Sequence, residues 1–321
     1  MQLQKIFNRT SLLIALSLPV IVSSCNKDDD PVVPASNTIT DLVVADANFS
    51  TLEAAVVKAN LAATLSGTGP FTVFAPDDAA FTAAGITPAV IATLTQAQLQ
   101  AILLYHTLGS KVTAADVPPG PNAKVVTASG DSVFVTKNAS GVYINGIKVT
   151  QADINADNGV IHKIGKVLNP PAGNIVETAV AAGLDSLVKA VTRATTAPGG
   201  DPTLAGTLGT ATLTVFAPTN AAFTQLLTAL SLSDINDIPV ATLLAVLRYH
   251  VVGGRAFSSD LANGSLPMLA GGNTTINLTD GTGGVPTIKG NGNGTATSNI
   301  TATNIVCRNG VVHLIDRVLL P

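Results

Sequence analysis

The spacing of apolar side chains predicts helices and short strands that alternate along the chain. In residues 99–106, a helical stripe recurs at i, i+3, i+4 and i+7. Thr95 and Gln98, just before it, have the spacing of a capping box, as do Ser50 and Glu53 further upstream. Residues 71–75 alternate instead with a period of two, which is typical of a strand, and Pro76 ends them. The pattern predicts a chain that contains both helices and strands.

The same pattern occurs twice in the chain. Three motifs of the first half return in the same order in the second half: 71–81 as 213–223, Leu104–His106 as Arg248–His250, and 158–162 as 309–313. The copies lie about 140 to 150 residues apart, too far for a solenoid repeat of about 20 to 50 residues. The chain is therefore predicted to hold two copies of one domain.

These three motifs resemble the signature of the fasciclin domain family. The resemblance rests on Thr-Val-Phe-Ala-Pro followed by Ala-Phe, on the Tyr-His pair, and on Asn-Gly-Val-(Ile/Val)-His near the end of each copy. It implies an α+β fold with tandem fasciclin domains at residues 38–170 and 171–321, each a β-wedge or sandwich flanked by helices. It also implies a role in adhesion or matrix contact, without a shared catalytic activity.

Two local structures follow from the motifs. Asp77 and Thr219 come directly after the Pro that ends each strand, where their side-chain oxygens would cap the next helix. In the second helix-opening segment, Asp185 is the expected N-cap. Asn158-Gly159 and Asn309-Gly310 are typical of a type I′ hairpin turn, which needs positive φ at both positions.

The Tyr-His pairs are candidates for either packing or partner contact. His106 and His250 fall on the apolar stripe of their helices, where a neutral, hydrogen-bonded imidazole is the usual outcome. Tyr105 and Tyr249 precede them. The resemblance links this motif to integrin binding in animal relatives, but the pattern favours a structural role.

A second candidate interaction motif lies before the first hairpin. Asp153-Ile154 resembles the Asp-Ile of adhesive sites in animal fasciclin domains. The second copy has Asn304 and Ile305, so the carboxylate is missing there.

The first 24 residues are expected to be a lipoprotein signal peptide. Lys5 and Arg9 precede an apolar stretch of signal-peptide length, which ends in small residues and Cys25, the expected lipidation site. An ordinary secretory signal with an incidental cysteine is the alternative. Residues 25–37 would be an acidic, Pro-containing tether, whose acidic run resembles the export signal of some bacterial surface lipoproteins. The expected location is the outer membrane of the cell envelope, facing either the surface or the periplasm.

Composition narrows the function classes further. Charged residues make up 12% of the chain, about half of the usual ~25%, and the net charge is −3. Without a basic cluster, nucleic acid is not an expected partner. Cys307 is the second of two cysteines and has Ala156 at its counterpart, so we expect a small buried residue rather than a nucleophile.

Catalytic and metal-binding patterns are not found in the sequence. Each copy offers two histidines on separate elements, whereas zinc needs three or four converging ligands. The serine-hydrolase elbow, the metalloprotease helix and the P-loop motif are missing. We therefore expect no enzyme, no cofactor and no metal.

The sequence as a whole predicts a membrane-anchored lipoprotein with two domains for adhesion or matrix interaction. Its partner would be an unidentified protein or polysaccharide. A glycan-binding or small-molecule-binding module is the alternative, with its site between the domains or beside segments that differ between the copies. Residues 195–210 are rich in Gly, Pro and Thr, and residues 270–298 in Gly, Asn and Thr, so both segments are expected to be loops. Such loops usually reflect tolerated surface variation, although binding residues also concentrate on loops.

Overall fold

The computed structural model describes residues 37–279 and 284–321. Residues 36–321 form one compact unit. Cys25, the signal peptide and most of the tether lie outside the described residues. Among the helices that the structure describes, none is long and apolar enough to cross a bilayer.

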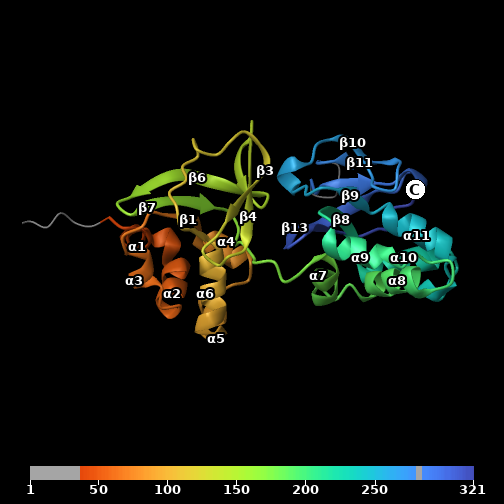
Figure 1. Cartoon of the computed structure of the whole chain (residues 1–321), viewed down its shortest axis with the longest axis horizontal. Coiled ribbons are helices and arrows are strands. Elements are labelled where there is room, and N and C mark those ends of the chain that lie inside the picture. The colour runs from red at the N-terminus through yellow and green to blue at the C-terminus, as the bar shows by residue number, and fades with distance from the viewer. Residues whose placement is uncertain (1–36, 280–283) are drawn as a thin grey trace, which may run out of the picture. The chain divides into compact units, whose positions relative to one another are not determined.

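Each copy builds a mixed sheet on a layer of helices (Figure 1). In the first copy the helices are α1 (Ile39–Ala45), α2 (Ser50–Lys58), α3 (Ala62–Leu65), α4 (Asp78–Ala83), α5 (Pro88–Thr93) and α6 (Gln96–Tyr105). Its strands are β1 (Phe71–Pro76), β2 (Thr107–Leu108), β3 (Gly120–Val126), β4 (Ser132–Asn138), β5 (Gly141–Ile144), β6 (Ile147–Ala156) and β7 (Gly159–Ile164).

The second copy repeats this arrangement. Its helices are α7 (Ile175–Ala181), α8 (Asp185–Thr196), α9 (Thr203–Thr210), α10 (Asn220–Ala229) and α11 (Val240–Arg248). Its strands are β8 (Leu213–Pro218), β9 (Val251–Gly253), β10 (Gly264–Pro267), β11 (Asn273–Asn277), β12 (Thr287–Lys289), β13 (Ser298–Cys307) and β14 (Gly310–Ile315).

The two sheets have the same strand order. In the described residues the orders are β2-β1-β7-β6-β5-β4-β3 and, from the same end, β9-β8-β14-β13-β12-β11-β10. The two motif strands of each copy, β1 with β7 and β8 with β14, pair in parallel, and Phe74 is in register with His162. The α+β class and the domain duplication expected from the sequence are therefore correct.

The central strands separate two cores in each copy. Val73 and Ile161 pack with the helices of the first copy, whereas Phe74 and Ile164 pack against the outer strands β4 and β5. This is the period of two expected of a strand, but with both faces buried. Phe74 and Phe81 therefore hold the strand-to-helix corner in different cores, and Asp77 caps α4 as predicted.

The predicted cap at Ser50 is wrong. A 3₁₀ turn, Ala47–Phe49, runs directly into α2, and Phe49 holds the N-cap position. The free N–H of Thr51 donates instead to Asp78 Oδ1 of α4 at 2.8 Å. The second copy does the same, because Ser186 N–H donates to Asn220 Oδ1 at 2.9 Å, and Asp185 is the first residue of α8 rather than its cap. The N-termini of α2 and α8 are thus capped by side chains of other helices, α4 and α10.

The predicted type I′ turns are also wrong. The residues between the paired ends of β6 and β7 are Asp157 and Asn158, and neither Asn158 nor Gly159 has a positive φ. The Asn158 side chain accepts from Ile39 N–H and donates to the carbonyls of Leu65 and Gly67. Asn158 therefore ties the hairpin to the first helices.

Gly159 and Gly310, which follow Asn158 and Asn309, are required for a reason other than a turn with positive φ. A Cβ on Gly159 would lie 2.1 Å from the carbonyl oxygen of Phe71 on β1, and one on Gly310 would lie 2.1 Å from that of Leu213 on β8. The neighbouring parallel strand approaches too closely for any side chain.

The segments expected to be loops are partly regular. Residues 195–210 contain the end of α8 and all of α9, and residues 270–298 contain β11 and β12. Gly and Pro in the first segment, and Gly and Asn in the second, lower the propensity for helices and strands, and tertiary packing overrides this effect. Leu208 and Ile288, for example, are buried in the two cores.

Candidate functional site

The two Tyr-His histidines are buried at the ends of α6 and α11. His106 Nδ1 lies 2.8 Å from the carbonyl oxygen of Ile102, and its Nε2 accepts from Leu168 N–H at 2.9 Å. His250 repeats both contacts, to Val246 and Leu319. A carbonyl needs a donor and an N–H needs an acceptor, so both rings are neutral with the proton on Nδ1. Burial lowers the pKa of each histidine to about 4.

These histidines join the helix layer to the segment that follows the last strand of each copy. Leu168 comes after β7 and Leu319 after β14, and both are buried. Neither imidazole has a nitrogen left for a partner or a metal. The structure thus places His106 and His250 inside the fold and not on a contact surface.

The two tyrosines hold the outer strands. Tyr105 Oη donates to the carbonyl of Ser132 at 3.1 Å and accepts from Asn145 Nδ2 at 3.0 Å. In the second copy, Tyr249 Oη donates to the carbonyl of Asn273 and accepts from Asn291 N–H. Both rings are buried, and burial raises the pKa of Tyr105 to about 12.

Asp153 lies at an irregular position of β6, with φ +58°. Its Oδ1 accepts from Ala114 N–H at 2.9 Å. Asn304 occupies the same position of β13 with φ +64°, and its Oδ1 accepts from Ser258 N–H at 2.8 Å. Asp and Asn tolerate left-handed backbone and present the same acceptor oxygen, so the missing charge in the second copy leaves this contact intact.

Ile154 is partly buried and packs against the helix-side core. The Asp153 side chain, in contrast, is 39% exposed. Among the six residues in the candidate interaction motifs, Asp153 has a polar side chain that accepts a hydrogen bond from a loop and is still exposed to solvent.

A contact that the sequence did not predict joins Asp153 to the closing motif. His162 Nδ1 accepts from Asp153 N–H at 3.2 Å, and His162 Nε2 lies 2.8 Å from the carbonyl of Val112. His162 therefore carries its proton on Nε2, the opposite tautomer to His106. His313 makes the same contacts, to Asn304 and Ala256, and burial lowers its pKa to about 4. The sequence offered one signal for this contact. Asp153 is replaced by Asn304 in the second copy, whereas the histidine that it contacts, His162, is retained as His313.

The sequence model of the Fasciclin domain matches residues 47–170 and 186–321. The chain belongs to the fasciclin domain family. The predicted boundaries, 38–170 and 171–321, stay predictions.

Relatives of this family member include two proteins of Synechocystis. Uncharacterized protein sll1735 is 42% identical over 132 residues, which are 40% of this chain and 96% of that protein. Protein sll1483 is 40% identical over 136 residues, 42% of this chain and 74% of that protein. Transforming growth factor-beta-induced protein ig-h3 of Sus scrofa is 35% identical over 144 residues, 45% of this chain but 21% of its own length.

Other candidate chemistry in these fasciclin domains is sparse. In residues 37–279 and 284–321, no three His, Cys, Asp or Glu side chains gather as a metal site requires. Cys307 is buried, its Sγ lies 3.3 Å from Thr178 Oγ1, and burial raises the pKa of its thiol. A buried thiol with a raised pKa is a poor nucleophile.

Proposed function

We propose that this protein is a lipid-anchored cell-envelope protein that presents two fasciclin domains for adhesion or matrix-type contact. Fasciclin domains are linked to adhesion and extracellular interaction in relatives, and the family match to both copies is the observation that carries the proposal. The buried Tyr-His pairs support a non-enzymatic role, because their polar atoms are used within the fold.

The anchor is proposed from the sequence around Cys25. An acylated cysteine with two or more chains holds a protein stably on a bilayer, whereas one chain holds it marginally. Cells that make the chain with Cys25→Ala should release it into the soluble fraction and should lose incorporation of labelled palmitate. Retention of the variant in the membrane fraction would contradict the anchor.

Adhesion can be tested separately from anchoring. Beads coated with residues 36–321 should bind to the cell or matrix surface to which the protein adheres. The same fragment in solution should compete with the beads for that surface. His106→Gln provides a control for the buried motif, since we expect it to lower the melting temperature while binding per folded molecule is unchanged. A variant that melts normally and no longer binds would make His106 a contact residue.

One cavity favours the alternative function, a glycan-binding or small-molecule-binding module. It lies in the second domain, has a volume of about 510 Å³, and is lined from both segments that differ between the copies. Asp201 and Arg248 pair across 2.6 Å at its wall, beside Thr207 and the exposed Leu269. Charged and hydroxyl groups next to an apolar side chain are suited to a sugar.

A glycan array with residues 36–321 tests this alternative. A positive glycan should bind at least tenfold more weakly to Arg248→Ala, which removes the guanidinium group from the cavity wall. Arg317→Ala, outside this cavity, is the matched control. Silence across the array, together with bead adhesion, would leave adhesion as the function.

A further inference from the structure

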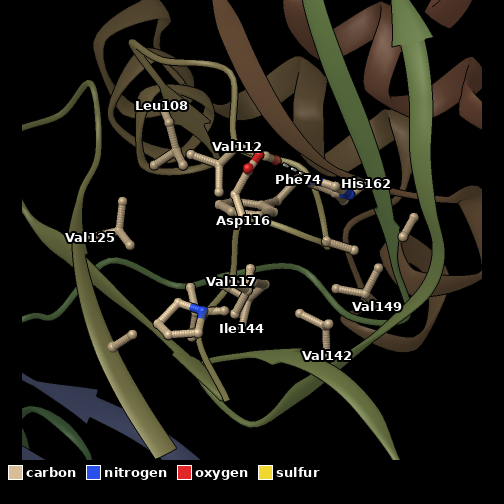
Figure 2. Close-up of a pocket in the computed structure, with 15 residues that line it drawn as sticks. Phe74, Leu108, Val112, Asp116, Val117, Val125, Val142, Ile144, Val149 and His162 are labelled. Carbon is tan, nitrogen blue, oxygen red and sulfur yellow. Dashed lines mark hydrogen bonds between the residues drawn. The ribbon is translucent and has the colours of Figure 1, made fainter. Parts of the chain in front are cut away.

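The first domain contains a second, different cavity (Figure 2). It has a volume of about 130 Å³ and lies between the inner face of strands β3 to β6 and residues 112–118. Figure 2 shows Val117, Val125, Val142 and Val149 around the open space, with Phe74 and His162 at one end. Its wall is almost entirely aliphatic.

The few polar groups at the wall are already occupied. Both nitrogens of His162 are hydrogen-bonded, to Asp153 N–H and to the carbonyl of Val112. One oxygen of the Asp116 carboxylate, Oδ2, accepts from the N–H and the hydroxyl of Thr113 at 2.8 and 2.7 Å, and Asp116 is exposed to solvent. A ligand in this cavity would therefore find no buried polar side chain in need of a partner, which favours an apolar molecule.

The segment that covers the cavity is held from three directions. Lys137 Nζ donates to the carbonyls of Ala114 and Val117 at 2.8 and 3.2 Å. Ala114 N–H donates to Asp153, and Val112 N–H donates to Thr72 Oγ1 at 2.9 Å. The cavity is thus preformed, so little ordering would accompany binding.

The second domain carries a larger side chain at two matching positions of the cavity wall, whereas Leu108 of this wall has the smaller Val252 as its counterpart. Val149 pairs with Ile164 at the end of β7, and Ile300 pairs with Ile315 in the same way. Strand register, followed outward from β6 and β13, likewise matches Val125 of β3 to Leu266 of β10. At these two positions the first domain has one methylene less than its own duplicate.

We propose that this cavity binds a compact, uncharged apolar ligand of about six to eight carbon atoms, such as a substituted benzene. An apolar cavity of about 150 Å³ stays dry and takes up benzene, which sets the scale for this one. The site is distinct from the larger polar cavity of the second domain, so it does not depend on the adhesion or glycan proposals.

Benzene is the probe, and residues 36–321 with labelled Val, Leu and Ile methyl groups are the protein. Titration should shift the methyl signals of Val125, Val149 and Ile144 saturably, with a Kd of about 1 mM or tighter. Val125→Leu with Val149→Ile, which introduces the side chains of the second domain, should weaken binding at least tenfold. Val126→Leu is the matched control, because Val126 is exposed and is not among the residues that line the cavity.

Three outcomes would overturn the proposal. They are the absence of saturable shifts, equal binding by the filled variant, and shifts centred on Val188 and Val191 at the helix-side cavity of about 160 Å³ in the second domain. Melting curves of the filled variant establish that it is folded. If it is not, Val149→Ile alone is measured, and binding at full strength then contradicts the site.

Discussion

Asp153 and Asn304 are the same structural position in two domains, and each uses its side-chain oxygen to hold the N–H of a residue in the segment after β2 or β9. The acceptors reach Ala114 at 2.9 Å and Ser258 at 2.8 Å. Both residues have positive φ, at +58° and +64°. What the two domains share at this position is an oxygen on a residue that tolerates left-handed backbone, not a negative charge.

This equivalence predicts the outcome of substituting Asp153. Asp153→Asn should change the free energy of unfolding by less than about 0.5 kcal/mol, since it installs the residue of the second domain. Asp153→Ala removes the acceptor and places a β-carbon without a hydrogen-bonding group at positive φ, so it should cost about 1–3 kcal/mol. Urea unfolding measures both. Equal costs for the two variants would show that the charge matters.

The buried histidines predict a loss of stability in mild acid. His106, His250 and His313 have an ordinary pKa of 6.5, which burial lowers to about 4 in the folded protein. Between these values the unfolded chain binds more protons than the folded one, so stability falls as the pH falls from 6.5 towards 4. Below a pH of about 4, the loss of stability caused by these histidines does not increase further. Each histidine should contribute about 3 kcal/mol to the full change.

Unfolding midpoints in urea between pH 7 and 4 measure this dependence. His106→Gln should be less stable at pH 7 but should show a smaller slope with pH, because one of the titrating groups is gone. Aspartates with a lowered pKa, such as Asp116, lose their contribution to stability mainly around and below the ordinary pKa of 3.8, so the histidines dominate the change between pH 6.5 and about 5. A flat profile down to pH 4.5 would mean that the imidazoles are not held neutral.

The close approach of parallel strands predicts a severe effect at Gly159. A methyl group there would meet the Phe71 carbonyl oxygen at 2.1 Å, and backbone cannot rotate away as a flexible side chain can. Gly159→Ala should cost more than about 3 kcal/mol or prevent folding of the first domain. Gly206→Ala, in α9 with open space around its Cβ position, should instead stabilise by about 0.5–1 kcal/mol. Similar melting temperatures for the two variants would contradict the contact.

The duplicated motifs explain which parts of the fold were predictable. Strand β1, the cap at Asp77 and the box at Thr95 depend on residues close in sequence, and the structure has them as expected. The cap of α2 could not be predicted in this way, because its acceptor is Asp78, far along the chain. The type I′ turn predicted at Asn158-Gly159 was wrong for the same reason. Gly159 is required by the close approach of β1 and not by the conformation of the turn.

The candidate site shows the same limit. Burial of His106 followed from its helical stripe, but its acceptor contact with Leu168 depends on the segment after β7, which no local pattern reveals. The link from Asp153 to His162 joins the neighbouring strands β6 and β7, where their register is irregular. The cavity of the first domain is lined from strands β3 to β6 and from residues 112–118, and the smaller side chain of Val149 is recognised only once Val149 and Ile300 are matched through strand pairing.

Tyr105 offers a test of the contact between helix α6 and the outer strands. Tyr105→Phe keeps the ring but removes the oxygen that donates to Ser132 and accepts from Asn145 Nδ2, which is itself buried. Leaving a buried amide donor without its partner costs about 1–3 kcal/mol, whereas a hydroxyl at a partly buried tyrosine contributes less. Tyr143→Phe, on β5 and partly buried, is therefore the matched control. Urea unfolding should separate the two variants by at least about 1 kcal/mol, and hydrogen exchange should accelerate in β4 and β5 of Tyr105→Phe alone. Equal stability of both variants would show that packing of the ring, without its hydroxyl, holds the strands.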